Sequence, residues 1–228
     1  MGLDILYEDN HLIAINKKVS DLVQGDKTGD ISLDVKVKAY LKKKYNKPGD
    51  VFIGVVHRID RPVSGVVLFA RTSKALIRLN NIFKERQLQK IYWAIVQEKP
   101  PEDNATIQHF LLRNPKKNKS FAYDLEREGT KKATLSYSFI GKSLKYYFLE
   151  IELHTGRHHQ IRAQLAKIGC SIRGDLKYGA KRSNPDSGIN LHARKLEFIH
   201  PVKQEKISIV AQPPDGELWK AFQLLDRG

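Results

Sequence analysis

Short runs of β-branched and aromatic residues constrain the fold of this chain more than any other feature of its sequence. Such runs occupy residues 51–56, 66–71, 90–97 and 146–154, with polar residues or glycine between them. Runs of this length and composition are typical of β-strands. Because consecutive strands dominate, without a steady strand–helix–strand alternation, the sequence predicts an α+β fold. Its centre is expected to be a mixed, mainly antiparallel β-sheet flanked by helices and loops.

Hydrophobic periodicity predicts the remaining elements. A strand pair is expected over residues 4–16, a hairpin from residues 133–140 to the run at 146–154, and two strands between residues 190 and 212. Apolar residues at helical spacing predict four helices. They are expected to begin at the N-caps Ser32, Ser73 and Thr155, with the third running to Lys167, and near Leu218.

Residues 98–131 are rich in proline, asparagine and charge, which predicts an irregular insertion with one short strand at 109–113. No internal repeat or flexible linker interrupts the pattern elsewhere. The simplest interpretation is one continuous domain over residues 1–228.

The charge balance narrows the classes of partner. Forty lysine and arginine residues against 25 acidic residues give a net charge of +15, which attracts a polyanion such as nucleic acid. A solubility bias without any binding role is the alternative. No run approaches the length of a membrane span, and the first residues do not resemble a secretion signal. The single cysteine, Cys170, excludes an intrachain disulfide, so a cytoplasmic location is expected.

The segment His57-Arg58-Ile59-Asp60 lies between two predicted buried strands, which places Asp60 on a loop. A carboxylate that faces inward there needs a compensating partner, because a buried unpaired carboxylate takes up a proton. The alternative is an exposed carboxylate that pairs with Arg58 or Arg61.

Arg162 is placed by helical periodicity next to Ile161 and one turn from Leu165, on the buried side of the third predicted helix. No acid lies within one turn, so its partner must come from elsewhere in the fold. Asp60 is a good candidate, and a bidentate pair would keep that carboxylate ionised. In the alternative, Arg162 reaches from the edge of the apolar stripe to water.

The start of this helix also suits a phosphate, because Thr155-Gly156 is followed by the cations Arg157 and Arg162. An ordinary amphipathic helix is the alternative. Three histidines in the same segment raise the question of a metal site. His158 and His159 would point about 100° apart on a helix, and the HExxH pattern is absent. We therefore expect no metal.

Three further residues have ambiguous patterns. Tyr92, early in the strand at 90–97, has a ring that could stack on a base and a hydroxyl for proton transfer, although a single strand tyrosine is more often part of the core. Leu191 and Leu196 could be core residues or the apolar wall of a base pocket.

Taken together, the segments HRIDRPVSGVVLFA, KIYWAIV, HTGRHHQIRAQLA, GDLKYGA and LHARKLEFIHP resemble the RluA-type RNA pseudouridine synthases, in which they occur in this order. The resemblance covers nearly the whole chain. It implies that Asp60 is the essential aspartate, Tyr92 the active-site tyrosine and Arg162 the arginine that pairs with the aspartate. It also places Arg58 near a flipped nucleotide and Leu196 at the uracil pocket.

RNA or uracil contacts are assigned on the same basis to six residues: Arg58, Arg61, Arg157, His159, Gln160 and Leu196. The chain departs from the family pattern at three positions. Ile59 replaces a usual leucine, Val63 stands where threonine is common, and Gln164 replaces a common histidine. The family pattern begins near residue 1, so a short form without the amino-terminal S4 domain is expected, in which the catalytic domain binds RNA by itself.

The implied reaction is an isomerisation of specific uridines in structured RNA, ribosomal or transfer, to pseudouridine. The target uridine must be flipped out of its stack. Asp60 acts as nucleophile or base, and whether it attacks base or sugar stays open. No cofactor, metal or obligate protein partner is implied, and a monomer suffices. The rivals are an RNA-binding protein without catalysis and a metal-dependent hydrolase that uses the histidines.

Overall fold

The computed structural model of the chain describes residues 2–26 and 29–225. The chain divides into two compact units. Unit 1 is Met1–Gln89 with Ala193–Gln212, and unit 2 is Lys90–His192 with Pro213–Gly228. The single continuous domain expected from the sequence stays a prediction.

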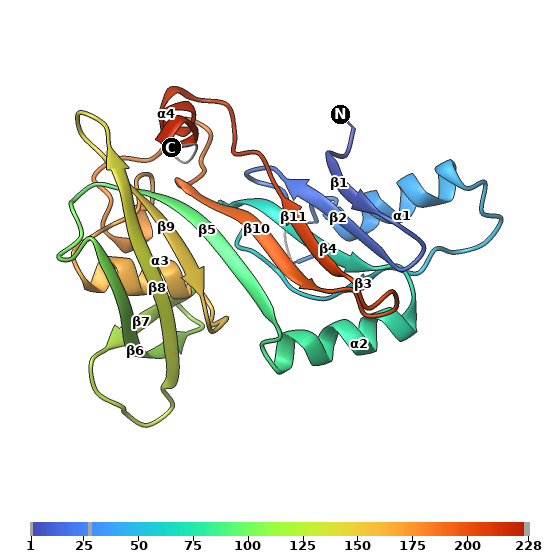
Figure 1. Cartoon of the computed structure of the whole chain (residues 1–228), viewed down its shortest axis with the longest axis horizontal. Coiled ribbons are helices and arrows are strands. Elements are labelled where there is room, and N and C mark those ends of the chain that lie inside the picture. The colour runs from blue at the N-terminus through green and yellow to red at the C-terminus, as the bar shows by residue number, and fades with distance from the viewer. Residues whose placement is uncertain (1, 27–28, 226–228) are drawn as a thin grey trace. The chain divides into compact units, whose positions relative to one another are not determined.

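Unit 1 contains an antiparallel sheet built from both ends of its sequence (Figure 1). Every residue of the strand after Asp60 is buried, as its apolar run predicted. The strands lie in the order β1 (Ile5–Glu8), β2 (Leu12–Lys17), β4 (Ser64–Ala70) and β10 (Leu191–Ile199), with β3 (Gly54–Val55) paired to β4 and β11 (Lys206–Val210) paired to β10.

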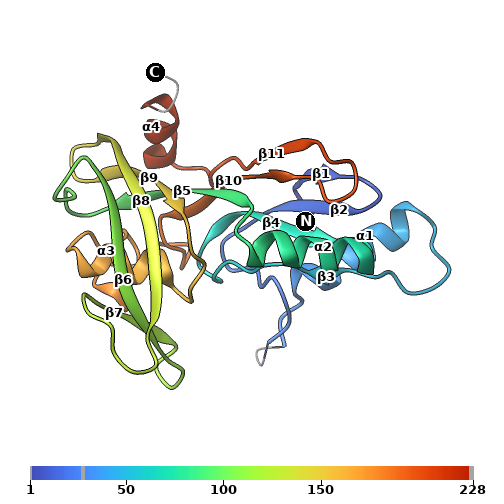
Figure 2. The same cartoon turned by 60° about the horizontal axis from the view of Figure 1, so that its bottom comes forward.

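Two helices complete unit 1. The helix α1 (Leu33–Lys44) has Ser32 as its N-cap, as predicted. The helix α2 (Ser73–Lys84) is capped by Thr72, whose hydroxyl accepts the Ala75 N–H at 3.2 Å, so the predicted cap at Ser73 was wrong by one residue. Figure 2 shows α2 running along β4, where its buried residues join the core of unit 1.

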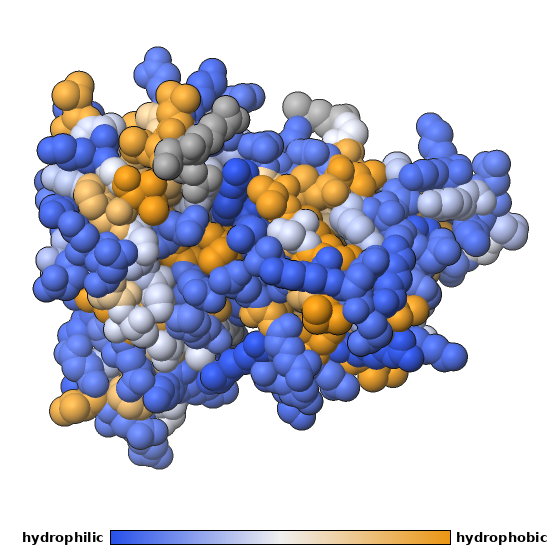
Figure 3. Space-filling view, viewed as in Figure 1, coloured by the Kyte–Doolittle hydropathy of each residue, from blue (hydrophilic) through white to orange (hydrophobic). Residues whose placement is uncertain are grey.

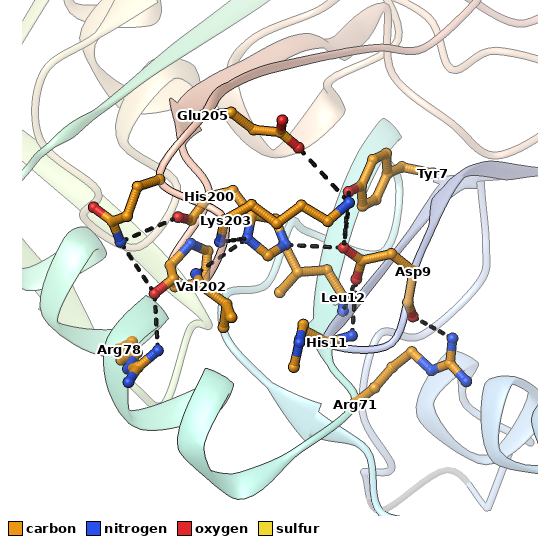
Figure 4. A network of polar contacts seen from close by, with 12 residues as sticks. Tyr7, Asp9, His11, Leu12, Arg71, Arg78, His200, Val202, Lys203 and Glu205 are labelled. Atoms are coloured by element: carbon orange, nitrogen blue, oxygen red, sulfur yellow. Dashed lines mark hydrogen bonds and ion pairs between the residues drawn. The ribbon is translucent and has the colours of Figure 1, made fainter.

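A polar network fixes the two turns of the unit 1 sheet (Figure 4). The Nδ1 atom of His200 accepts backbone N–H groups from residues 202 and 203 at 3.1 and 2.9 Å. On the other side of the ring, Nε2 lies 3.0 Å from Oδ2 of Asp9. The other oxygen of Asp9 accepts the N–H groups of residues 11 and 12, each at 2.8 Å. The turn between β1 and β2 is thereby tied to the turn between β10 and β11.

The strands of unit 2 pair in antiparallel fashion, and the hairpin of β8 and β9 was predicted correctly. The short strand predicted at 109–113 is confirmed, because it lies within a longer strand. The irregular course predicted for the rest of residues 98–131 was wrong, because the segment contains two strands that form a hairpin. The longer of them, β6, buries only His109 and Leu111, so its sequence lacks a strong apolar signal. The order is β5 (Leu88–Val96), β9 (Tyr147–Leu153), β8 (Lys131–Lys142), β6 (Asn104–Asn114) and β7 (Lys119–Tyr123).

The helices of unit 2 are α3 (Gln160–Lys167), the single 3₁₀ turn η1 (Leu176–Tyr178) and α4 (Glu217–Leu225). The prediction that α3 begins at Thr155 was wrong, because the Thr155 hydroxyl donates to the Gln160 side chain at 2.7 Å instead of capping the helix. The phosphate site was inferred from a helix start at Thr155-Gly156, and it loses that basis. The terminal helix α4 packs Trp219 and Phe222 on the sheet.

Candidate active site

Asp60 lies half-buried in the loop between β3 and β4, as the sequence predicted. Its backbone oxygen accepts the Val63 N–H at 3.0 Å, which closes a turn around Pro62. We call residues 60–63 the Asp60 turn. The side chain before it, Ile59, is buried, whereas Arg58 is exposed. Asp60 therefore directly follows a residue whose apolar side chain anchors the loop in the core.

His57, for which the sequence suggested no role beyond packing or hydrogen bonding, connects this loop to the core of unit 1. Its Nε2 atom accepts the backbone N–H of Leu68 at 3.0 Å, and its ring stacks on Phe83 with centroids 4.9 Å apart. The hydrogen bond attaches the loop to β4, and the ring contact attaches it to α2.

Lys17 binds the Asp60 turn through backbone oxygens, a role that the sequence did not indicate. Its side chain is only 1% exposed, although lysine is among the residues that are rarely buried. The Nζ atom donates to the backbone oxygens of Lys18 at 2.8 Å, Arg61 at 2.9 Å and Val63 at 2.7 Å. The only sequence signal is a lysine at the end of the apolar run that became β2.

Burial lowers the pKa of Lys17 to about 7, because the charged ammonium is removed from water. The neighbouring carboxylates of Asp21 and Asp60 favour the charged form, whereas Arg61 and Lys36 oppose it. The Asp60 turn is thus held by Lys17, a group whose charge changes near neutral pH.

Gly65 allows β4 to begin directly after the Asp60 turn. Its φ of +115° is one that L side chains rarely adopt, and a Cβ atom there would lie 2.2 Å from the Ala193 backbone oxygen. Only glycine permits this approach of β4 to β10.

Arg162 lies on α3 and faces the buried side, as predicted. Its Nε and Nη2 atoms donate to the two carboxylate oxygens of Asp175 at 2.7 and 2.9 Å. The two side chains are 6% and 1% exposed, so the alternative in which Arg162 reaches water was wrong. The sequence analysis required an acid but missed Asp175, which lies 13 residues further along, in the irregular segment before η1. Asp60 belongs to unit 1, and its pairing with Arg162 stays a prediction.

Tyr178 and His159 complete the surroundings of Arg162. The Arg162 guanidinium lies over the Tyr178 ring, 5.1 Å from its centroid. The Tyr178 hydroxyl accepts the Ser120 N–H at 2.8 Å and lies 3.0 Å from Nδ1 of His159. Burial, with the charge of Arg162 as the next cause, lowers the pKa of His159 to about 2. The ring is therefore neutral, and its Nδ1 shares a hydrogen bond with the Tyr178 hydroxyl.

The segment before α3 forms a compact turn. The Gln160 side chain is 3% exposed, and its amide oxygen accepts the Thr155 hydroxyl at 2.7 Å and the Arg157 N–H at 3.0 Å. His158 and His159 precede the helix and stack at 3.8 Å, so their expected separation of about 100° on a helix was wrong. Among residues 2–26 and 29–225, no three His, Cys, Asp or Glu residues are grouped to hold a metal ion.

The structure divides the remaining predicted site residues between the units. In unit 1, Leu196 is 3% exposed within the core, and Arg61 is exposed and pairs with Asp30 at 2.7 Å. In unit 2, Tyr92 is 9% exposed on β5, opposite Ile151 of β9. The RNA and uracil contacts that the sequence analysis assigned to six residues stay predictions. These residues are Arg58, Arg61, Arg157, His159, Gln160 and Leu196.

Hydrophilic residues cover most of the face drawn in Figure 3, as the lysine and arginine content predicts. No helix within the described part of the chain is long and apolar enough to cross a membrane. The cytoplasmic location stays a prediction.

Comparison with known proteins connects this arrangement to one family. The family described as "RNA pseudouridylate synthase" matches residues 11–167. The "Ribosomal large subunit pseudouridine synthase C" of Rickettsia prowazekii (strain Madrid E) is 33% identical over 213 residues, which cover 92% of this chain and 68% of that protein. The protein of the same name from Buchnera aphidicola subsp. Schizaphis graminum (strain Sg) is 34% identical over 216 residues, which cover 91% and 66%. The chain spans about two thirds of the length of these relatives.

Among solved structures, "Human RNA Pseudouridylate Synthase Domain Containing 4" aligns with a TM-score of 0.80 at 21% identity, covering 98% of this chain and 93% of that one. This likeness shows the fold. The predicted α+β class, with a mainly antiparallel sheet and flanking helices, is confirmed.

Proposed function

Because this chain belongs to the RNA pseudouridylate synthase family and is thus an isomerase of uridine in RNA, we propose that Asp60 is the carboxylate that begins the reaction. The observation that carries the proposal is the half-buried position of Asp60 on a turn fixed by His57 and Lys17. A group held in one geometry before substrate binds needs little reorganisation in the transition state.

The reaction breaks the bond between N1 of uracil and C1' of ribose and forms a bond between C5 and C1'. The C5 proton is lost to solvent, and N1 gains a proton. Asp60 acts as nucleophile or as base in the first step. Arg162, already oriented by Asp175, keeps the carboxylate ionised, and Tyr92 stacks on the uracil and assists the removal of the C5 proton.

The target uridine is inaccessible while stacked, so it must be flipped into the site. Cationic side chains that contact phosphates contribute binding energy that offsets the cost of unstacking. We assign these contacts to Arg58, Arg61 and Arg157, and uracil contacts to His159, Gln160 and Leu196. The names of the relatives favour RNA of the large ribosomal subunit as substrate, with transfer RNA as the alternative.

The test replaces Asp60 with Asn and measures tritium release from RNA labelled at C5 of uridine. Asp50→Asn is the matched control, because Asp50 is an exposed loop carboxylate of the same unit. We expect release by the wild type and the control, and none by Asp60→Asn. Equal release by Asp60→Asn and the wild type would refute the proposal.

The same assay with separated RNA classes tests the substrate. The purified chain alone is expected to release tritium from large-subunit ribosomal RNA and not from transfer RNA. Tritium release from transfer RNA alone would mean that transfer RNA, and not ribosomal RNA, is the substrate. Activity that requires a second protein would contradict a self-sufficient monomer.

A further inference from the structure

We propose that Lys17 is the positioning residue of Asp60: its ammonium holds the Asp60 turn in the catalytic geometry only while it carries all three of its protons. The inference rests on the proposed role of Asp60. Lys17 itself is not expected to touch the uridine.

The contacts of Lys17 define the path of the chain immediately after Asp60. Two of its three acceptors are the backbone oxygens of Arg61 and Val63, on either side of Pro62. Val63 in turn donates its N–H to the Asp60 oxygen at 3.0 Å, and the Arg61 oxygen also accepts the Ser20 N–H at 3.1 Å. A shift of Lys17 Nζ therefore moves both ends of the Asp60 turn.

The number of protons on Nζ matters because every one of them is used. An ammonium has three N–H donors, and the three carbonyls of Lys18, Arg61 and Val63 take all of them. A neutral amine has two, so one carbonyl then faces a lone pair. With Lys17 1% exposed, water has little access to replace the lost donor.

Four charged groups act on Lys17 across the elements around it. Asp60 on the turn and Asp21 after β2 favour the ammonium, whereas Arg61 on the turn and Lys36 on α1 oppose it. Lys36 is itself paired with Asp21 at 2.6 Å, which weakens both influences. Burial outweighs these groups and lowers the pKa of Lys17 to about 7. Loss of the third proton then falls within the physiological pH range.

A purely structural role for Lys17 makes a different prediction. Between pH 7 and 10.5 the unfolded chain binds the Lys17 proton more strongly than the folded chain does, so this group makes the fold more stable as the pH rises. If Lys17 only supported the fold, activity would be constant or increase over this range. A positioning role requires activity to decrease while stability increases.

The experiment compares pH–rate profiles, from pH 6 to 9, of the wild type, Lys17→Met and Lys18→Met under single-turnover conditions. Wild-type activity should fall about tenfold per pH unit above 7, down to the level of Lys17→Met. Lys17→Met should be slower at pH 6 and flat across the range. Lys18→Met, at the exposed neighbour, should keep the wild-type profile. A falling limb that persists in Lys17→Met overturns the proposal.

A second measurement does not depend on Lys17→Met being folded. The Cε resonance of Lys17 in ¹³C-lysine-labelled wild type should titrate with the midpoint of the activity profile, and at lower pH in Asp60→Asn, which lacks one favourable charge. Midpoints of titration and activity that differ by more than about half a pH unit overturn the inference. An active Asp60→Asn would instead refute the proposed function, so the two failures are distinct.

Discussion

The Asp60 turn of unit 1 and the surroundings of Arg162 in unit 2 are held in place by different kinds of contact. The turn is irregular backbone, and Lys17 holds it through backbone carbonyls. Arg162 lies on a helix, and the side chains of Asp175 and Tyr178 hold it through an ion pair and a ring contact. We call Arg162, Asp175, Tyr178 and His159 the Arg162 cluster.

The two regions should therefore respond differently to pH. Arg162 stays charged and His159, with its pKa lowered to about 2 by burial, stays neutral over the range in which enzymes work. Lys17, with its pKa lowered to about 7 by burial, does not stay in one state. The comparison locates pH sensitivity near neutrality in unit 1 and a constant charge arrangement in unit 2.

The largest effect on stability is expected from Asp175→Asn. The substitution leaves the buried Arg162 charge without its carboxylate, and such a loss typically costs about 3 to 5 kcal/mol. Chemical denaturation should reveal it, with Asp215→Asn, an exposed acid of unit 2, as the control. Equal stability of the two variants would mean that the Arg162 cluster does not depend on this pair.

Gly65→Ala should damage unit 1 to a slightly smaller extent. A Cβ atom 2.2 Å from the Ala193 oxygen, at a φ of +115°, forces β4 away from β10. Strain of this kind costs on the order of 1 to 3 kcal/mol before any shift of the sheet. Thermal unfolding is the measurement. Gly49→Ala, where a Cβ atom meets nothing within 4 Å, should be neutral, and a neutral Gly65→Ala would contradict the close approach.

The alkaline range should reveal the contribution of Lys17 in unit 1, because the window of His159 lies below pH 6.5. Since the pKa of Lys17 is lowered from 10.5 to about 7, the free energy of unfolding of the wild type should rise between pH 7 and 10 relative to Lys17→Met. Denaturant titrations at several pH values measure the difference. If the free energies of unfolding of the wild type and Lys17→Met change in parallel with pH, Lys17 does not lose its proton between pH 7 and 10.

The acid range should reveal a slope of the same sign from unit 2, in a separate pH window. Because burial lowers the pKa of His159 from 6.5 to about 2, the unfolded chain takes up this proton first, and stability is lost as the pH falls below 6.5. His159→Asn, which tolerates the left-handed φ of 51°, should flatten this limb. If His159→Asn loses stability below pH 6.5 as the wild type does, groups other than His159 cause this loss.

The smallest effect is expected from Arg61→Ala. Its side chain forms an exposed ion pair with Asp30, worth about 0 to 1 kcal/mol to stability, while its backbone oxygen is the one that Lys17 uses. The variant should fold normally and bind RNA more weakly, with a smaller salt dependence. Filter binding at several salt concentrations tests this, and unchanged affinity would remove Arg61 from the RNA contacts.

Much of the fold was predictable, because buried strands such as β4 and the periodic helices α1 and α2 have strong apolar patterns. The hairpin of β6 and β7 was not, since an exposed edge hairpin needs few apolar residues. The late start of α3 depends on a left-handed residue, His159, which no periodicity indicates.

The candidate site was predicted unevenly for a related reason. The helical register of Arg162 indicated a buried guanidinium that needs an acid, and this was confirmed. Asp175 and Lys17 were missed because their importance arises from contacts made in three dimensions. The sequence contains them only as one acid in a loop and one lysine at the end of a strand.

The acceptors of Lys17 belong to the main chain, so no side-chain replacement at positions 61 or 63 removes them. Residue types on the Asp60 turn can drift in evolution while the ammonium continues to meet the same carbonyls. Valine at position 63 presents its carbonyl to Lys17 as any other residue type would. For this set of hydrogen bonds, the constraint on side-chain type lies on one lysine, 43 positions before Asp60 in the chain.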